Sequence, residues 1–277
     1  MKAARRSVLS AIGAAATIGS APSALVAAPA LTQRRKNYVL VHGTWHGGWA
    51  WSRVAEHLRA QGHQVVTPTM TGCGERFHLI RPDTSLSTHI DDVVHAIEWE
   101  EMEDVILVCH SFAGTTVTGA ADRLQERISH MVFYDALIPT VERPAAIMRD
   151  PATGDYPKSW QERTKGFRDG YKMIFWDHYP VEMLVPKDDV DNIALLKRRL
   201  TWHPAGQWTE PLELKNGGWE EFPRTCIEAA GQIFSPSSER MLGPGRGPGW
   251  DFVSLDVARD GFLTHPKVLA ECLGSIG

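Results

Sequence analysis

The sequence lacks the cysteine pairs and the long basic runs that mark several functional classes. Its 277 residues contain four scattered cysteines and no Cys-x-x-Cys pair, which argues against a zinc site or a redox dithiol. Lys and Arg total 29 against 33 Asp and Glu, and no basic run is longer than three residues, as at Arg34-Arg35-Lys36. A nucleic-acid partner requires a basic face, so this composition argues against that class of partner.

The first 30 residues differ in composition from the rest of the chain. Paired Arg5 and Arg6 precede a stretch rich in Ala and Gly, which ends at Ala28-Pro29-Ala30, a small-x-small pattern typical of a signal cleavage site. The paired arginines resemble a twin-arginine export signal. Residues 1–30 are therefore expected to direct export to the periplasm or the medium, with no membrane contact after their removal. An uncleaved anchor, or a wrongly assigned start of the chain, is the alternative.

From residue 37 onward, apolar runs of strand length alternate with helical patterns. The strand-like segments are 37–42, 64–68, 104–109, 129–139 (its strand ending at Asp135), 224–230 and 251–257. The helical patterns cover 51–62, 87–100, 112–126 and, at the C-terminus, 265–276. Strands that are apolar on both sides and alternate with helices predict an α/β fold, with a mostly parallel sheet covered by helices on both faces.

Residues 139–222 break this rhythm. Prolines recur, and only 187–200 has a clear helical pattern. Five of the ten tryptophans fall in the segment, namely Trp160, Trp176, Trp202, Trp208 and Trp219. We interpret the segment as a cap inserted over the carboxyl edge of the sheet, with 37–138 and 223–277 as the core. An irregular connection with a small core of its own is the alternative. Tryptophans in a cap favour a substrate with an apolar or aromatic group.

Ser111 lies where the apolar run 104–109 gives way to a helical pattern. A nucleophile elbow places a serine between small residues at such a strand-to-helix turn, because the sharp turn brings neighbouring backbone close. Cys109 and Ala113 take the places of the usual glycines, and both are small. The pattern therefore predicts Ser111 as a nucleophile; a serine that only caps the turn is the alternative.

A glycine-rich turn at His42-Gly43-Thr44 follows the first predicted strand. We expect the backbone N–H groups of Thr44 and Phe112 to point toward the reacting carbonyl and to hold a developing oxyanion. His42 is interpreted as a structural residue of the turn rather than as a base. His42 and Trp45 are also candidate substrate-binding residues.

Four segments carry a resemblance to a known family. They are HGTWHGGWAW (42–51), TMTGCGERFHL (69–79), DDVVHAIE (91–98) and HPKVLAECL (265–273). The chain resembles the α/β-hydrolase superfamily, in the branch that includes plant methyl esterases and hydroxynitrile lyases. The resemblance implies an α/β-hydrolase fold with an inserted helical cap. It also implies an acyl-transfer site in which a serine attacks, a histidine takes its proton, a carboxylate orients the histidine, and two backbone N–H groups hold the oxyanion.

The resemblance points to Asp135 as the acid. The family usually places the acid after the strand at 224–230, but Gly231 and Gln232 stand there. Some members carry it one strand earlier, which is the position of Asp135. No metal and no organic cofactor are implied.

The resemblance also implies that Arg259 stands where the family has its histidine. Arginine keeps its proton at neutral pH and cannot act as a base. His265, six residues later, is the candidate base. Six residues span about 9 Å in a helix and about 20 Å when extended, so His265 reaches the site only if the loop folds differently. A helix-cap role is the alternative for His265. Arg259 itself is a candidate to pair with a substrate carboxylate or phenolate, or with Asp135.

These features predict an exported serine hydrolase of the esterase type, acting on a small apolar or aromatic ester. Its catalytic residues would be Ser111, Asp135 and His265. Two alternatives stay open, since a fold does not determine a function. One is a non-hydrolytic lyase or cyclase that acts on a natural product. The other is a ligand-binding protein on a hydrolase scaffold that has lost its histidine.

Overall fold

The computed structural model describes residues 34–145, 147–231 and 242–277, so the predicted export signal lies outside the described residues. Residues 35–277 form one compact unit. Within the described ranges, no helix combines the length and the apolar character needed to cross a bilayer.

A six-stranded parallel sheet forms the centre of this unit, in the order β2-β1-β3-β4-β7-β8. The strands are β1 (Asn37–Val41), β2 (Gln64–Val66), β3 (Val105–His110), β4 (Ile128–Tyr134), β7 (Arg224–Ala229) and β8 (Asp251–Leu255). All six predicted strands are confirmed, with ends that differ by a few residues. The order reverses at β1, since β2 lies on one side of it and β3 on the other. In open α/β sheets such a reversal opens a crevice at the carboxyl ends of the strands.

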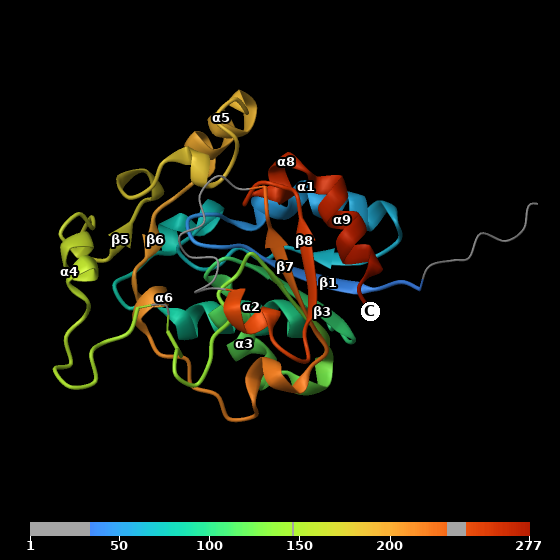
Figure 1. The fold of residues 1–277 in the computed structure, drawn as a ribbon, viewed down its shortest axis with the longest axis horizontal. Helices are drawn as coiled ribbons and strands as arrows, with labels where there is room; N and C mark the ends of the chain where they lie inside the picture. The colour runs from blue at the N-terminus through green and yellow to red at the C-terminus, as the bar shows by residue number, and fades with distance from the viewer. Residues whose placement is uncertain (1–33, 146, 232–241) are drawn as a thin grey trace, which may run out of the picture. The chain divides into compact units, whose positions relative to one another are not determined.

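Helices cover both faces of the sheet, as predicted. The helices of the core are α1 (Ser52–Ala60), α2 (Leu86–Trp99), α3 (Ala113–Arg123), α8 (Gly261–Thr264) and α9 (Pro266–Ser275). In Figure 1, α2 and α3 lie on one side of the sheet, and α1, α8 and α9 on the other. Within each group, α2 packs against α3 and α1 packs against α9. Every residue of β3 is buried between these layers, which explains why its sequence is apolar without alternation.

The segment 139–222 contains more secondary structure than its sequence pattern predicts. The predicted helix is present as α5 (Val190–Arg199). The structure adds the short helices α4 (Lys158–Thr164) and α6 (Gly206–Thr209) and an antiparallel pair, β5 (Lys172–Met173) with β6 (His203–Pro204). The role of this segment as a cap stays a prediction.

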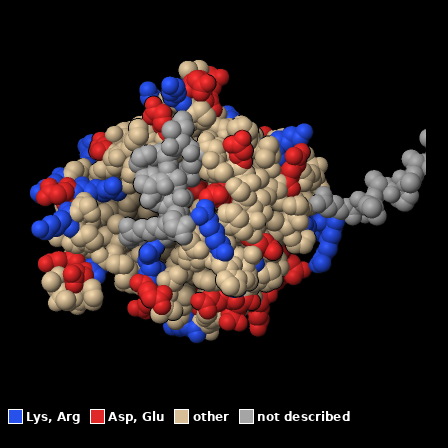
Figure 2. Space-filling model, in the orientation of Figure 1, with Lys and Arg blue, Asp and Glu red and all other residues tan. Residues whose placement is uncertain are grey.

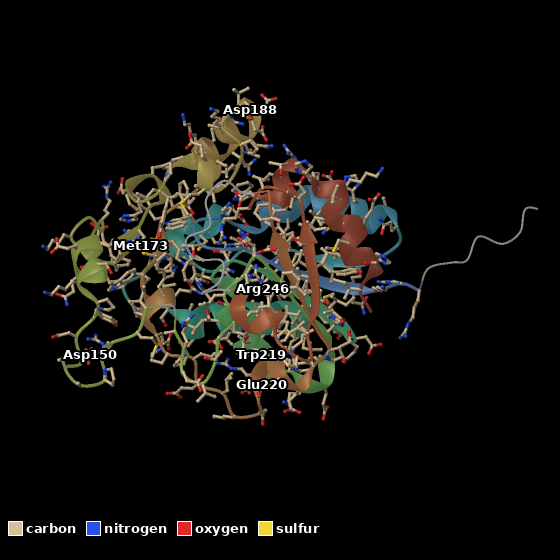
Figure 3. The ribbon with its side chains drawn as sticks, in the orientation of Figure 1. Asp150, Met173, Asp188, Trp219, Glu220 and Arg246 are labelled. Atoms are coloured by element: carbon tan, nitrogen blue, oxygen red, sulfur yellow. The ribbon has the colours of Figure 1, made fainter. Side chains whose placement is uncertain are left out.

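Charged side chains are mixed over the face of the molecule shown in Figure 2. Lys and Arg alternate with Asp and Glu around its rim, and neither sign gathers into one large patch. Figure 3 shows the side chains in the same view; Met173 lies on β5, and Trp219 and Glu220 lie where the segment 139–222 returns to the sheet.

Gly114, in the first turn of α3, permits a close approach that a side chain would prevent. A Cβ atom at Gly114 would lie 1.7 Å from the carbonyl oxygen of Leu137, in the loop after β4. We therefore expect Gly114→Ala to lower the free energy of unfolding by about 3 kcal/mol, because the loop must move away from the helix.

Urea unfolding followed by circular dichroism checks this expectation. Gly166→Ala is the matched control, since a Cβ atom there would have its nearest contact at 3.6 Å. We expect the control to stay within about 0.5 kcal/mol of the wild type. Equal stability of the two variants would show that the loop after β4 is not tightly packed against α3.

Candidate active site

Ser111 sits on a sharp turn between β3 and α3, in the left-handed backbone region with φ of 59°. Neighbouring backbone holds it on two sides. The N–H of Ser111 donates to the carbonyl oxygen of Asp135 at 3.2 Å, and the N–H of Leu137 donates to the carbonyl oxygen of Ser111 at 2.8 Å. Such a strained and tightly held turn is the geometry of a nucleophile elbow, which presents the serine side chain at the carboxyl edge of a sheet.

The loop after β1 runs directly against this turn. A Cβ atom at Gly43 would lie 2.8 Å from Cβ of Ser111, so only a glycine lets the two segments meet. Thr44 follows in this loop, and Phe112 follows the serine. Among the residues that the structure describes, neither the N–H of Thr44 nor that of Phe112 donates to a protein acceptor. Phe112 also caps the N-terminus of α3, where the helix dipole favours negative charge.

Arg259 connects the serine to the predicted acid. Its Nη2 donates to Oγ of Ser111 at 2.8 Å, and its Nη1 donates to Oδ2 of Asp135 in an ion pair. The Arg259 side chain is 12% exposed, and that of Asp135 is 1% exposed. A guanidinium is a hydrogen-bond donor that keeps its proton, so this contact gives the serine a donor rather than a base. The arrangement can polarise a carbonyl or hold an anionic oxygen.

His265 lies outside this group of residues, which does not support its expected role as the base. Its side chain is exposed, and its Nδ1 meets the hydroxyl of Thr264 at 2.9 Å. Among the described residues, no hydrogen bond joins it to Ser111 or Asp135. His265 is the N-cap residue of α9, but its side chain makes no capping hydrogen bond. The segment before α9 forms the helix α8 (Gly261–Thr264), and it does not bring the imidazole of His265 to the serine.

His42 is buried in the turn after β1, with hydrogen bonds at both ring nitrogens. Its Nδ1 donates to the carbonyl oxygen of Gly43 at 2.8 Å, and its Nε2 accepts the N–H of Met70 at 3.0 Å. Burial lowers the pKa of His42 to about 3, so the ring is neutral. Both ring nitrogens are occupied, which leaves His42 no free group for a substrate.

An aromatic layer surrounds the loop after β1. Trp45, with φ of 68°, packs edge-on against Phe175, Tyr179 and Trp208. Trp208 stacks on Phe112 at 4.1 Å between ring centroids, and its Nε1 donates to Oγ1 of Thr44 at 3.1 Å. Phe112, next to the serine, is thus in contact with an aromatic side chain from the segment 139–222.

Sequence reasoning missed two buried polar groups close to the site. In the first, Nδ1 of His203 lies 3.2 Å from Sγ of Cys73, and its Nε2 meets Oε1 of Gln207. Burial raises the pKa of the Cys73 thiol and lowers that of His203, so both are uncharged. The second group pairs His46 with Asp260, two residues that are remote in sequence. The second histidine of HGTWHGGW was a signal for this pair, as was the carboxylate next to Arg259.

The alpha/beta hydrolase family model matches residues 38–271, and the chain belongs to this family. It is 37% identical over 250 residues to the carbendazim hydrolyzing esterase of a Nocardioides species, a match that covers 87% of this chain and 99% of that protein. Methylesterase 2 of Arabidopsis thaliana is 29% identical over 178 residues, which are 60% of this chain and 67% of the relative.

A solved structure confirms the α/β-hydrolase fold. It is an extracellular alpha/beta-hydrolase from a Paenibacillus species, described as sharing homology with Tobacco Salicylic Acid Binding Protein 2. The two superpose with a TM-score of 0.68 at 22% identity, over 87% of this chain and 99% of that one. Because the curated relatives are named esterases, the chain is a hydrolase of the esterase type, and the resemblance to plant methyl esterases is confirmed.

Proposed function

We propose that this chain is a serine hydrolase of the carboxylesterase type, with Ser111 as its nucleophile and a small apolar or aromatic ester as its substrate. The observation that carries the proposal is the setting of Ser111. The serine lies on a strained turn at the carboxyl edge of the sheet, next to two backbone N–H groups, those of Thr44 and Phe112, that donate to no described residue.

In the proposed reaction, the ester carbonyl lies against Oγ of Ser111, with its oxygen held by the N–H groups of Thr44 and Phe112. Attack forms the bond from Oγ to the carbonyl carbon, and the hydroxyl proton passes to water. Collapse of the tetrahedral intermediate then breaks the bond from the carbonyl carbon to the alkoxy oxygen, and this oxygen takes a proton from water as the alcohol leaves. A second water attacks the acyl-enzyme, so that the acid is released and the serine oxygen regains a proton from water. Asp135 would balance the charge of Arg259 throughout.

We further propose that Arg259 occupies the position of the triad base. In support, it contacts both Ser111 and Asp135, the two residues that a triad histidine would join. Since the guanidinium accepts no proton, turnover by this chain is expected to be slow. Loss of a triad member lowers kcat by about 10⁴ to 10⁶ in a comparable enzyme, and the oxyanion hole still leaves some catalysis.

The aromatic layer supports an apolar or aromatic substrate. Phe112 and Trp208 stack beside the serine, and Trp45 packs against Trp208. The names of the relatives point the same way, since they include a carbendazim hydrolyzing esterase, methylesterases and a methyl jasmonate esterase from Vitis vinifera. Carbendazim and methyl esters of aromatic acids are therefore the first compounds to test.

A non-hydrolytic role is the second candidate, and the contact between Arg259 and Ser111 favours it. A serine that accepts a hydrogen bond from a fixed cation is suited to hold a carbonyl or an anionic oxygen. A lyase or cyclase would use this pocket to polarise a carbonyl without an acyl-enzyme. A ligand-binding protein would only hold the compound.

Export is a separate proposal, and it rests on residues 1–30. It is supported by Arg5 and Arg6 in the sequence, and by the extracellular α/β-hydrolase of Paenibacillus among the similar structures. Export would place the active site in the periplasm or the medium.

A fluorophosphonate probe and a chromogenic short-chain ester together test the proposed function. We expect the probe to label the wild type at Ser111, with slow ester turnover, and Ser111→Ala to lose both signals. Thr264→Ala is the control, because the hydroxyl of this half-buried residue hydrogen-bonds only to His265 among the described residues. Labelling without turnover would favour the lyase or cyclase. Neither signal, together with tight binding of an aromatic compound, would favour the ligand-binding protein.

A further inference from the structure

Two hydrogen-bond acceptors face one buried imidazole close to the site. Nδ1 of His46 lies 2.9 Å from the carbonyl oxygen of Thr44, and Nε2 lies 3.0 Å from Oδ2 of Asp260. The two side chains are 2% and 0% exposed. A carbonyl oxygen and a carboxylate both only accept, so both ring nitrogens must donate for both contacts to be hydrogen bonds. A ring with two donors is an imidazolium.

The charged groups around His46 favour a positive charge on its imidazole ring. Burial lowers the pKa of His42 in the same loop, of His110 on β3 and of His203 on β6, so these three rings are neutral. Arg259, the neighbouring cation, is paired with Asp135. The other oxygen of Asp260 meets no donor among the described residues, so its buried charge depends on His46 for compensation.

The pair of His46 and Asp260 joins the two segments that carry the proposed chemistry. On one side, it holds the carbonyl group of Thr44, whose N–H is the proposed oxyanion donor. On the other side, Asp260 follows Arg259 directly. Tyr134 also holds the segment that contains Arg259 and Asp260. Its hydroxyl donates to the carbonyl oxygen of Ala258 and accepts the N–H of Gly261, each at 3.1 Å.

We infer that the protonated pair His46–Asp260 is a positioning device, which sets the place of the Thr44 N–H relative to the side chain at position 259. The inference rests on the proposed function for its effect on Ser111, but not for the proton that it assigns to His46. Neither residue touches the reacting atoms in this account.

Asp260→Asn removes the charge of the pair but can keep the hydrogen bond between positions 46 and 260. An asparagine can donate from its amide nitrogen to Nε2 of His46, while Nδ1 still donates to Thr44. The contact then survives with a neutral ring. His46→Gln, in contrast, cannot reach both acceptors with the same geometry. Asp251→Asn, at the exposed start of β8, is the matched control.

Three measurements test the inference. Nitrogen NMR of the His46 ring at pH 7.5 should show two protonated nitrogens in the wild type and in Asp251→Asn, and one in Asp260→Asn. Fluorophosphonate labelling of Ser111 should slow about 10- to 100-fold in His46→Gln and stay within about threefold in Asp260→Asn. Amide exchange at Gly261 should be about tenfold faster in His46→Gln.

The results separate this inference from the proposed function. A neutral His46 ring in the wild type overturns the assigned proton. Unchanged exchange at Gly261 in His46→Gln overturns the positioning role. If the wild type is not labelled at all, the proposed function fails, while the NMR and exchange results still decide whether the pair is protonated and holds the segment.

Discussion

Arg259→His is expected to raise the rate of ester hydrolysis by about 10² to 10⁴-fold, the usual contribution of a positioned general base. The guanidinium of Arg259 donates a hydrogen bond to Ser111 and cannot accept the proton of the serine hydroxyl. A neutral imidazole between Ser111 and Asp135 would accept that proton. The surrounding segment is already fixed, because Tyr134 holds the backbone at Ala258 and Gly261. Initial rates with a chromogenic ester measure the gain.

Two further variants control for simple removal of the arginine. Arg259→Ala removes the cation without adding a base, and Arg259→Gln keeps a neutral donor. The histidine variant should also acquire a rate that rises with pH as its imidazole loses a proton, near the ordinary value of about 6.5. The proposal that position 259 is that of the triad base fails if Arg259→His is no faster than Arg259→Ala.

Acid is expected to unfold this protein steeply below about pH 6. Burial lowers the pKa of His42 to about 3 and lowers those of His110 and His203 well below the ordinary value. The unfolded chain protonates its histidines near pH 6.5, so below that pH it binds more protons than the folded chain. The free energy of unfolding then falls as pH falls, by about 1.4 kcal/mol per pH unit for each such histidine.

These three histidines alone contribute a slope of about 4 kcal/mol per pH unit, against a total stability of about 5–15 kcal/mol for a typical protein. Burial also lowers the pKa of His63, His89, His130 and His178, which adds to the slope. Urea unfolding at several values between pH 7.5 and 5 measures this slope, above the range in which most carboxylates titrate. His110→Leu is the informative variant, because neither ring nitrogen of His110 hydrogen-bonds to a described residue. It should reduce the slope by about 1.4 kcal/mol per pH unit. An unchanged slope would mean that His110 takes up its proton as readily in the folded protein as in the unfolded chain.

The parts of the fold that could be predicted from sequence are those with a periodic apolar pattern. The strand β3 is buried on both faces and appears as a continuous apolar run, whereas α2 buries Ile90, Val93 and Ile97 at helical spacing, so each was visible in the sequence. The helices α4 and α6 are short, and they depend on contacts such as the stacking of Trp160 on Trp208. No local pattern reports such a contact, so both were missed.

The same reasoning explains what was found of the site. The approach of Asp135 to Ser111 could be expected, because the carboxyl ends of the neighbouring parallel strands β3 and β4 meet at one edge. The contact of Arg259 with Asp135 was one of several interpretations that the sequence left open, and the structure contains this ion pair. The residues His46 and Asp260 each stand in a segment that the sequence marked, but they are 214 positions apart and no periodic pattern pairs them, so their contact was missed.

The left-handed backbone of Trp45, Ser111 and Asp135 bears on how this protein tolerates change. Each non-glycine residue in that region costs about 1–2 kcal/mol, and all three stand where the strands end at the site. Glycine would relieve the cost at any of them, but it would remove an aromatic ring, the hydroxyl or the carboxylate. Selection for heat resistance alone would therefore favour glycine substitutions at the proposed active site. Such substitutions would raise the free energy of unfolding and lower the catalytic rate.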